Sequence, residues 1–266
     1  METKKKKNKR KKNINDTNNK NNEHKNQESS NINTNNNNNK VKYFLMIPFE
    51  QEDFISTFKN ISEKLEKENP KNFDTNLLQK PQKLHLTLVV LDINENKEKT
   101  EKIINIINNI LKDIKDILSG ELFYNFEKFD VFDSIKKTKV IFAKMIEDEN
   151  NYKLKMMTNL IIKKLVEENI LNKKDLENLH INEEYSDGEL IYAIKYHITL
   201  LNVKYLNRAL QKEKKPFVNE IDASDILESI KNIKFPECKL DKINLCAMRE
   251  DESNGKYEII HTFNIL

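Results

Sequence analysis

Two segments of the chain place a histidine and a threonine two residues apart inside an apolar run, and they constrain the fold most. They read Leu-His-Leu-Thr-Leu at residues 84–88 and Tyr-His-Ile-Thr-Leu at residues 196–200. Alternation of polar and apolar residues is typical of a half-buried β-strand. Because side chains alternate along a strand, each histidine shares a face with its threonine, while leucine and isoleucine point into the opposite layer. Each polar pair should therefore project from a strand face that would otherwise be buried.

Strand and helix periods alternate around both segments in a similar order. Strand patterns occupy residues 43–48, 84–91, 123–132, 140–146, 196–203, 238–248 and 257–265. Helical spacing occurs at residues 54–65, 103–118 and 154–165, with a short helix at 226–230. The order strand-helix-strand-helix-strand occurs twice, with one extra strand, which indicates an internal duplication. We expect one folded domain over residues 41–266, with its two repeats divided near residue 135. Residues 167–189 and 211–220 are polar, and the first of these stretches is an insertion before the second histidine strand.

The first 40 residues are rich in Asn and Lys and contain few apolar side chains. Such a segment cannot bury enough apolar surface to fold, so we expect residues 1–40 to be disordered. Eleven basic residues against four acids give this tail a net charge of +7. Since the whole chain carries +3, residues 41–266 carry −4 (3 − 7). Any contact of the domain with nucleic acid should therefore use a local cleft rather than a broad basic surface.

The composition also excludes several classes of protein. The charged start and the lack of long apolar runs predict neither a signal peptide nor a membrane span. Cys238 and Cys246 form no CxxC pair, which predicts reduced thiols in an intracellular protein. The three glycines are scattered, which argues against P-loop and Rossmann sites. No clustered Cys, His and carboxylate spacing is present, so we expect no metal and no cofactor.

The basic run at residues 4–12 has three interpretations. It is a candidate nuclear localisation signal, a loose nucleic-acid contact, or a solvated tail without a role. The predicted location is therefore cytoplasmic, nuclear or both.

The paired motifs suit acid–base chemistry on a phosphate. A single strand histidine is more often structural, but two His-x-Thr pairs at matching positions indicate a functional site. Histidine titrates near neutral pH, so one copy can act as a base and the other as an acid. Each threonine hydroxyl can bond a non-bridging phosphate oxygen. The candidate catalytic residues are His85 and His197, and the candidate phosphate-binding residues are Thr87 and Thr199.

Other polar and aromatic residues have weaker signals. Tyr43, Phe44 and Tyr196 adjoin the motif strands and could stack on a base, with core packing as the alternative. Arg249 ends an expected strand and could contact a phosphate, or could be solvated. The remaining histidines are expected to be solvated or structural: His24, His180 and His261.

These motifs and their surroundings resemble the 2H phosphoesterase superfamily. The segments YFLMIPF, KLHLTLVVL, YHITLLNV and EIDASDILESI resemble the branch that contains the nuclear-localisation-signal domain of A-kinase anchor protein 7-like proteins. The first subunit of the activating signal cointegrator complex belongs to the same branch. The resemblance spans residues 41–266 and implies a duplicated, bilobal α+β fold with lobes of roughly residues 41–135 and 136–266. Two antiparallel sheets would flank a pseudo-twofold central cleft, with helices on the outside. It carries the site roles over to His85, Thr87, His197 and Thr199.

Two family features are absent from the sequence. The GxxG loop of the KH module found in the cointegrator subunit is missing, and no kinase-anchoring helix is recognisable outside the folded part.

The expected function is that of a monomeric, metal-independent phosphodiesterase. The resemblance implies action on RNA ends, 2′,3′-cyclic phosphates or 2′-5′ oligonucleotides, and leaves the acid and base assignment open. Two alternatives stand beside it. One is a module that binds an AMP-like nucleotide or RNA without turnover. The other is a subunit of a nucleic-acid repair or transcription coactivator assembly.

Overall fold

The computed structural model describes residues 42–91, 93, 96–115, 121–178, 182–186, 189–193 and 195–265. The basic tail, His24 and His180 lie outside these residues. Among the helices of the described part, none has the length and apolar character needed to cross a membrane.

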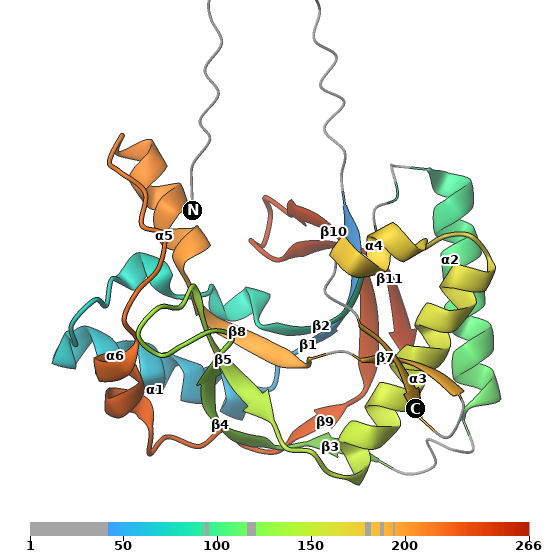
Figure 1. The fold of residues 1–266 in the computed structure, drawn as a ribbon, viewed down its shortest axis with the longest axis horizontal. Coiled ribbons are helices and arrows are strands. Elements are labelled where there is room, and N and C mark those ends of the chain that lie inside the picture. The colour runs from blue at the N-terminus through green and yellow to red at the C-terminus, as the bar shows by residue number, and fades with distance from the viewer. Residues whose placement is uncertain are drawn as a thin grey trace, which may run out of the picture. The chain divides into compact units, whose positions relative to one another are not determined.

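Seven strands form one antiparallel sheet in the order β11-β10-β1-β2-β8-β5-β4 (Figure 1). In chain order, the strands are β1 Tyr43–Pro48, β2 His85–Leu91, β4 Phe126–Val131, β5 Val140–Met145, β8 His197–Asn202, β10 Lys242–Glu250 and β11 Tyr257–Asn264. The sheet consists of two antiparallel halves, β11-β10-β1-β2 and β8-β5-β4, joined where Leu86 of β2 pairs with Ile198 of β8. The antiparallel α+β fold expected from the resemblance is confirmed, with its two sheets joined edge to edge.

The two halves of the sheet interleave along the sequence. Strand β4 precedes residue 135 but pairs with β5, which follows it. Strands β10 and β11 come last in the chain but complete the half that contains β1 and β2. The expected lobe boundary near residue 135 therefore does not coincide with the division between the two halves of the sheet.

Two further strand pairs lie outside the main sheet. Strand β3 (Leu122–Tyr124) pairs with β9 (Cys238–Leu240), so the strands expected at 123–132 and 238–248 are each divided in two. Strands β6 (Asn182–Ser186) and β7 (Glu189–Ala193) pair with each other; β6 lies inside the expected polar insertion, and β7 begins at its last residue.

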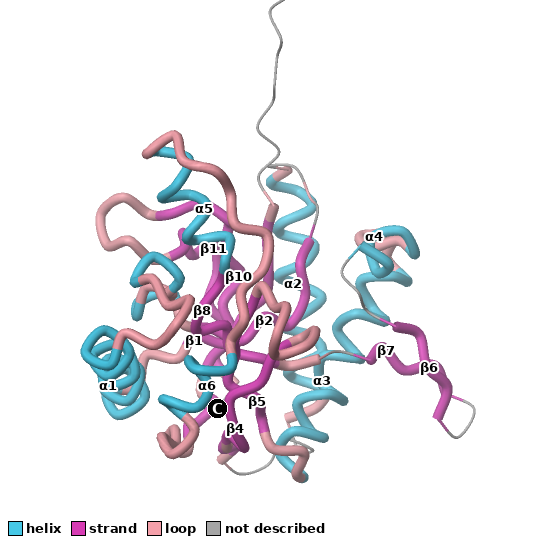
Figure 2. The backbone as a smooth tube through the Cα atoms, turned by 60° about the vertical axis from the view of Figure 1, so that its left-hand side comes forward, coloured by secondary structure: helices cyan, strands magenta, loops and turns pink. Residues whose placement is uncertain are grey.

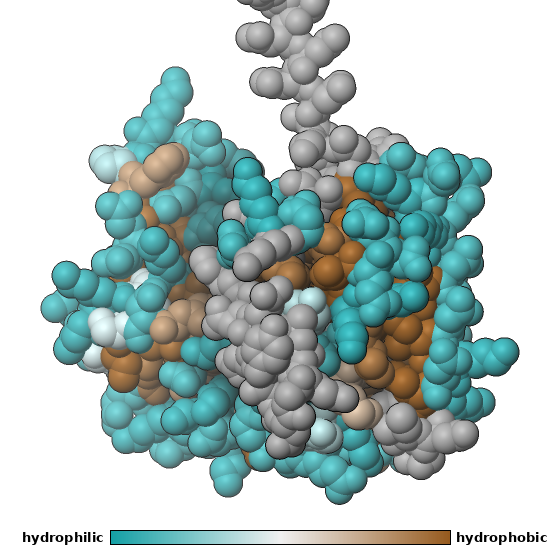
Figure 3. Space-filling view, turned by 45° about the vertical axis from the view of Figure 1, so that its right-hand side comes forward, coloured by the Kyte–Doolittle hydropathy of each residue, from teal (hydrophilic) through white to brown (hydrophobic). Residues whose placement is uncertain are grey.

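The long helices pack their apolar stripes against one face of the sheet. Helix α1 illustrates the cause: Phe54, Phe58, Ile61 and Leu65 recur at helical spacing, and all four are buried in the main core. Helix α2 lies beside α3, and α1 lies beside α6 (Figures 1 and 2). From the side of α2 and α3, hydrophilic residues cover much of the visible described surface (Figure 3). The helices are α1 Glu52–Glu68, α2 Lys97–Asp113, α3 Glu149–Glu167, α4 Lys173–Asn178, α5 Val203–Lys212 and α6 Ser224–Ile230, with short 3₁₀ turns η1 Thr75–Leu77 and η2 Pro81–Lys83.

The opposite face of the sheet is the one that carries the polar motifs. There Phe44, Met46 and Cys246 form a separate small cluster with Val90 and Tyr257. Helix α5 begins directly after β8, where the sequence pattern indicated only the end of a strand and a polar stretch. Its apolar residues Val203, Leu206 and Leu210 do follow helical spacing, but Val203 also continues the apolar run of β8, so the sequence pattern assigned this position to the strand.

Candidate active site

The two His-x-Thr motifs lie on neighbouring strands in the centre of the sheet. Leu86 pairs with Ile198, and continuing this antiparallel register places His85 opposite Thr199 and Thr87 opposite His197. All four polar side chains are partly buried, whereas the residues between and after them are fully buried on the other face. The two histidines therefore lie on a diagonal of the strand pair, for which a Cα separation of roughly 7–8 Å is typical.

Each histidine ring is fixed by a backbone carbonyl two residues earlier. His85 Nδ1 lies 2.7 Å from the carbonyl oxygen of Lys83, and His197 Nδ1 lies 2.9 Å from that of Lys195. Because a carbonyl oxygen only accepts, Nδ1 carries the proton and donates it in both rings. The neutral ring then keeps its free lone pair on Nε2. Both imidazoles are thus held in the tautomer that can take or return a proton through Nε2.

Aromatic side chains enclose each imidazole in the same way. His85 contacts Phe44 and Tyr257, with ring centroids 5.4 Å away in both cases. His197 contacts Phe142 at 5.5 Å and Phe132 at 4.7 Å. Phe44 and Phe142 come from the strands next to the two motif strands, β1 and β5. The pseudo-twofold relation therefore extends beyond the motifs to their aromatic walls.

A lysine completes each half of the site, and sequence reasoning missed both. Lys83 Nζ lies 5.0 Å above the ring of Tyr257, and Lys195 Nζ lies 5.0 Å above that of Phe132. The signal was present in the sequence, because both segments read Lys-x-His-x-Thr. We call each set of lysine, histidine, threonine and two aromatic rings a half-site, named after its histidine.

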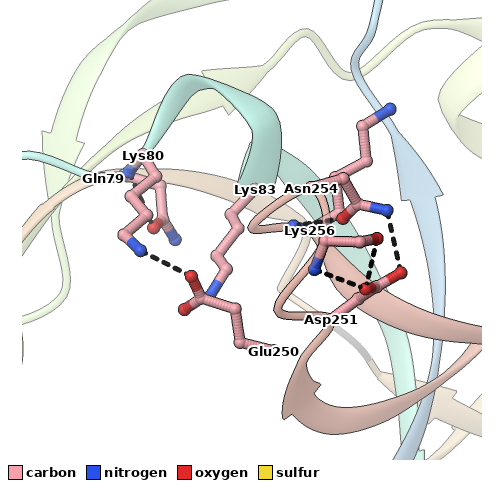
Figure 4. Close-up of polar contacts among 8 residues, drawn as sticks. Gln79, Lys80, Lys83, Glu250, Asp251, Asn254 and Lys256 are labelled. Atoms are coloured by element: carbon pink, nitrogen blue, oxygen red, sulfur yellow. Dashed lines mark hydrogen bonds and ion pairs between the residues drawn. The ribbon is translucent and has the colours of Figure 1, made fainter.

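Charge distinguishes the two half-sites. Glu250, at the end of β10, accepts from Lys83 at 2.5 Å and from Lys80 at 2.7 Å (Figure 4). These two hydrogen bonds lower the pKa of Glu250 to about 2, so it is ionised at neutral pH. Lys195 is exposed and forms no ion pair with any residue that the structure describes. The His85 half-site is therefore partly neutralised, and the His197 half-site keeps an unpaired cation.

The turn after β10 helps to position Glu250. The Asp251 carboxylate accepts from the Asn254 side chain, and the Asp251 N–H donates to the Lys256 carbonyl at 2.9 Å (Figure 4). The carboxylate also accepts from the Ser253 hydroxyl. Gly255 closes this turn with φ +70°, where a Cβ would meet the Gln82 side chain at 3.0 Å. The turn therefore holds the adjacent Glu250 carboxylate close to Lys80 and Lys83, which precede β2.

Burial lowers the pKa of both histidines. For His85, burial outweighs the hydrogen bond to Lys83 and brings the pKa to about 4, with a smaller contribution from His197. Burial also lowers the pKa of His197, and the charge of Lys195 acts in the same direction. Both imidazoles are therefore predominantly neutral in the free protein at pH 7.

A cavity of about 820 Å³ opens beside the His85 half-site. His85, Thr87, Phe44 and Tyr257 form part of its wall, and helix α5 with residues 75–80 forms the other side. Its lining contains five cations and two carboxylates: Lys80, Lys83, Lys204, Arg208, Lys212, Glu213 and Glu250. The lining does not include His197 or Thr199. The cavity is locally basic although residues 41–266 carry a net negative charge.

The other residues that the sequence singled out are placed differently. Phe44 contacts His85, but Tyr43 and Tyr196 are buried in the main core on the other face, and the Tyr196 hydroxyl points to the Leu154 carbonyl. These two tyrosines cannot contact a ligand there. Arg249 forms an ion pair with Glu258 and does not line the cavity. His261 packs against Phe263 at 4.6 Å. In the described part of the chain, no three His, Cys, Asp or Glu side chains form a group that could hold a metal ion.

The folded part of the chain is similar to proteins of a known family. The sequence profile of the AKAP7 2'5' RNA ligase-like domain matches residues 41–265. The chain therefore belongs to this family, which lies within the 2H phosphoesterase superfamily. No protein matched in a search of curated sequences.

Solved structures of similar fold include TT0787 of Thermus thermophilus, at a TM-score of 0.51 and 14% identity over 84% of this chain and 97% of that one. LigT of E. coli complexed with 3'-AMP aligns at a TM-score of 0.48 and 13% identity over 84% and 97%. Usb1 of Kluyveromyces marxianus with uridine monophosphate aligns at 0.40 and 8% over 85% and 97%. At these identities the likeness to TT0787 concerns the fold alone.

Proposed function

We propose that the domain is a phosphodiesterase that cleaves phosphodiester bonds of RNA ends, 2′,3′-cyclic phosphates or 2′-5′ oligonucleotides without a metal ion. The observation that carries this proposal is the diagonal pair of histidines with Nε2 free on both rings. Membership of a phosphoesterase superfamily supports the same reaction class.

The proposed reaction uses one neutral and one protonated imidazole. The neutral ring removes a proton from the attacking water as its oxygen bonds to phosphorus. The protonated ring gives its proton to the departing ester oxygen as the phosphorus–oxygen bond breaks. Thr87 and Thr199 lie across from the histidines and donate to the non-bridging oxygens, where negative charge increases in the transition state.

Binding of the substrate favours the acid form of one imidazole, which takes its proton from solvent. Both histidines are neutral in the free protein near pH 7, because burial lowers both pKa values. A phosphate bound between the rings places a negative charge beside them, which favours protonation and raises their pKa values again. Binding of the phosphodiester thus converts one of two bases into an acid. Which ring is protonated depends on the orientation of the substrate in the cleft.

A second candidate function follows from the same two pKa values. If the bound phosphate does not restore a proton to either ring, the site has two bases and no acid. It would then hold a nucleotide phosphate without hydrolysing it. Three further expectations remain predictions from the sequence. They are a role as a subunit of a nucleic-acid-handling assembly, the monomeric state, and a nuclear or cytoplasmic location.

The experiment uses the full chain in EDTA with three substrates: 2′,3′-cyclic nucleotides, 2′-5′ oligoadenylate and 3′-5′ RNA. The site variant is His85→Ala with His197→Ala, and the matched control is His261→Ala, because His261 lies on β11 and is not part of either half-site. We expect turnover by the wild type and the control, and none by the site variant. Tight AMP binding without turnover on any substrate would favour the binding module.

A further inference from the structure

Helix α5 presents three cations to the cavity beside His85. Lys204, Arg208 and Lys212 recur every fourth residue, which places them on one side of the helix, and all three line the cavity. Val203 and Leu206 bury another side of the same helix in the core. We call this set of three cations the α5 wall.

The helix that carries the α5 wall is fixed in place by polar contacts. The Asn202 side chain caps its N-terminus by accepting from Lys204 N–H at 2.8 Å. Gln79 Nε2 donates to the Tyr205 hydroxyl at 2.6 Å, and Gln79 N–H donates to the Leu200 carbonyl at 2.8 Å. The Asn207 amide exchanges two hydrogen bonds with the Val218 backbone. These contacts therefore hold the α5 wall in a fixed position in the lining of the cavity.

The three cations of the wall have no carboxylate partner within the described chain. The two acids of the same cavity are already engaged: Glu250 binds Lys80 and Lys83, and Glu213 binds Lys215 at 2.7 Å. Cations four residues apart on a helix repel one another. A row of unpaired cations in a cavity is stabilised when an extended anion with several charges binds along it.

A nucleic-acid backbone fits this row better than a single phosphate does. All three cations line the same cavity as His85 and Thr87, so a strand with one phosphate at this half-site can pass along the helix. Lys204 and Lys212 are eight residues apart, which corresponds to about 12 Å along the axis of an α-helix. The cavity volume of about 820 Å³ lies toward the upper end of the range for pockets of small ligands, roughly 300–1,000 Å³.

We propose that the α5 wall binds the backbone phosphates of a single strand on the His85 side of the reacting phosphate, so that the preferred substrate is an oligonucleotide. This inference rests on the proposed function, because it assigns the direction in which the substrate leaves the histidine pair. It also explains how a domain of net negative charge would hold RNA, through a local basic cleft.

The test compares binding of a fluorescent 2′-O-methyl RNA dinucleotide and octanucleotide to the full chain by anisotropy, over a range of salt concentrations. The α5 variant carries Lys204→Gln, Arg208→Gln and Lys212→Gln. The matched control carries Lys59→Gln, Lys67→Gln and Lys71→Gln, which remove the same charge from residues that do not line the cavity. The basic tail is common to all these proteins, so its contribution cancels in the comparison.

We expect the α5 variant to bind the octanucleotide about tenfold or more weakly than the control does, and the dinucleotide within about threefold of it. Loss of up to three phosphate contacts should lower the slope of log affinity against log salt by about 2. A charge-conserving variant, Lys204→Arg with Arg208→Lys and Lys212→Arg, should bind like the wild type. Equal loss in the α5 variant and the control would overturn the inference, as would a preference of the wild type for an oligoglutamate peptide over RNA.

The outcomes for binding and for turnover are separable. Length-dependent binding that needs the α5 wall, without turnover, would leave this inference standing and remove the proposed hydrolysis. Turnover with no effect of the α5 variant on octanucleotide affinity would leave the proposed hydrolysis standing and remove this inference.

Discussion

Lys83 and Lys195 occupy equivalent positions in the two half-sites, and Glu250 pairs with Lys83 while Lys195 has no carboxylate partner among the described residues. Each lysine lies two residues before its histidine, and each ammonium group lies 5.0 Å above an aromatic ring that contacts that histidine. The backbone of the site is thus nearly symmetric, while its charge is not. Of these two lysines, only Lys83 has its charge offset by a carboxylate within the described part of the chain.

Lys195→Gln should raise the pKa of His197, because the lysine charge disfavours protonation of the neighbouring ring. An NMR titration of the imidazole C–H resonances would measure this shift. Lys71→Gln removes the same charge away from the half-sites and should leave the His197 titration unchanged. An unchanged His197 in the Lys195 variant would show that the ammonium group is too well solvated to affect the ring.

Glu250→Gln should increase the affinity for AMP by about threefold to tenfold, since Lys80 and Lys83 lose their competing anion. Isothermal titration at low salt would measure the change, and raising the salt concentration should reduce it. The control is Glu258→Gln, which removes a carboxylate that pairs with Arg249 outside the cavity lining. Weaker AMP binding in the Glu250 variant would mean that the carboxylate holds the two lysines in a binding geometry.

His85→Ala and His197→Ala should each lower kcat by about 10²–10⁴-fold, the usual contribution of a general acid or base. The two rings act as a unit, so the double variant should be little slower than either single one. Thermal unfolding should show intact folds, because both side chains lie on the partly open face of the sheet. A single variant that retains more than about a tenth of the wild-type rate would contradict the proposed mechanism.

Thr87→Val and Thr199→Val should each reduce kcat by about 10–100-fold while KM changes by less than about threefold. The hydroxyl is assigned to charge that develops in the transition state, so its loss affects the rate more than substrate binding. Steady-state kinetics on the best substrate would separate the two parameters. Thr57→Val on α1, whose hydroxyl donates to the Asp53 carbonyl, provides the matched control. Equal increases in KM with no loss of kcat would assign the threonines to binding.

Acid should destabilise the protein through His85 in the window between pH 6.5 and about 4. The pKa of this ring is about 4 in the folded state and 6.5 in its ordinary state, so the unfolded chain binds more protons across that window. Stability is therefore complete above pH 6.5 and falls as the pH drops toward 4, by up to about 3 kcal/mol. Urea unfolding of the wild type and His85→Gln at several pH values would measure it. The difference between the two proteins should diminish with falling pH; a constant difference would show an ordinary pKa for His85.

The sequence revealed those parts of the fold and site that depend on local pattern. Helix α1 follows the spacing of Phe54, Phe58, Ile61 and Leu65, and the motif strands follow the alternation around His85 and His197. Burial of the residues between each histidine and threonine follows from the same alternation. These features need only neighbours in the chain, so they can be read without knowledge of the tertiary structure.

The remaining features depend on contacts between distant segments. Tyr257 reaches His85 across more than 170 residues, and Glu250 reaches Lys83 across 167. Nothing in the local pattern of either segment indicates such a partner. The same limitation applies to Tyr43 and Tyr196, which were candidates for base contacts because they adjoin the motif strands. The alternation along β1 places Phe44 at the site and Tyr43 in the core.

The interleaved sheet has a consequence for how the protein acquires its site during synthesis. The His197 half-site is assembled from Phe132, Phe142, Lys195, His197 and Thr199, all of which lie within a continuous stretch in the middle of the chain. The His85 half-site needs Tyr257, which belongs to the last strand, β11. A nascent chain can therefore form the surroundings of His197 first. The surroundings of His85 are complete only after almost the whole polypeptide has left the ribosome. Until β11 pairs with β10, the growing chain has the surroundings of His197 in place and those of His85 incomplete.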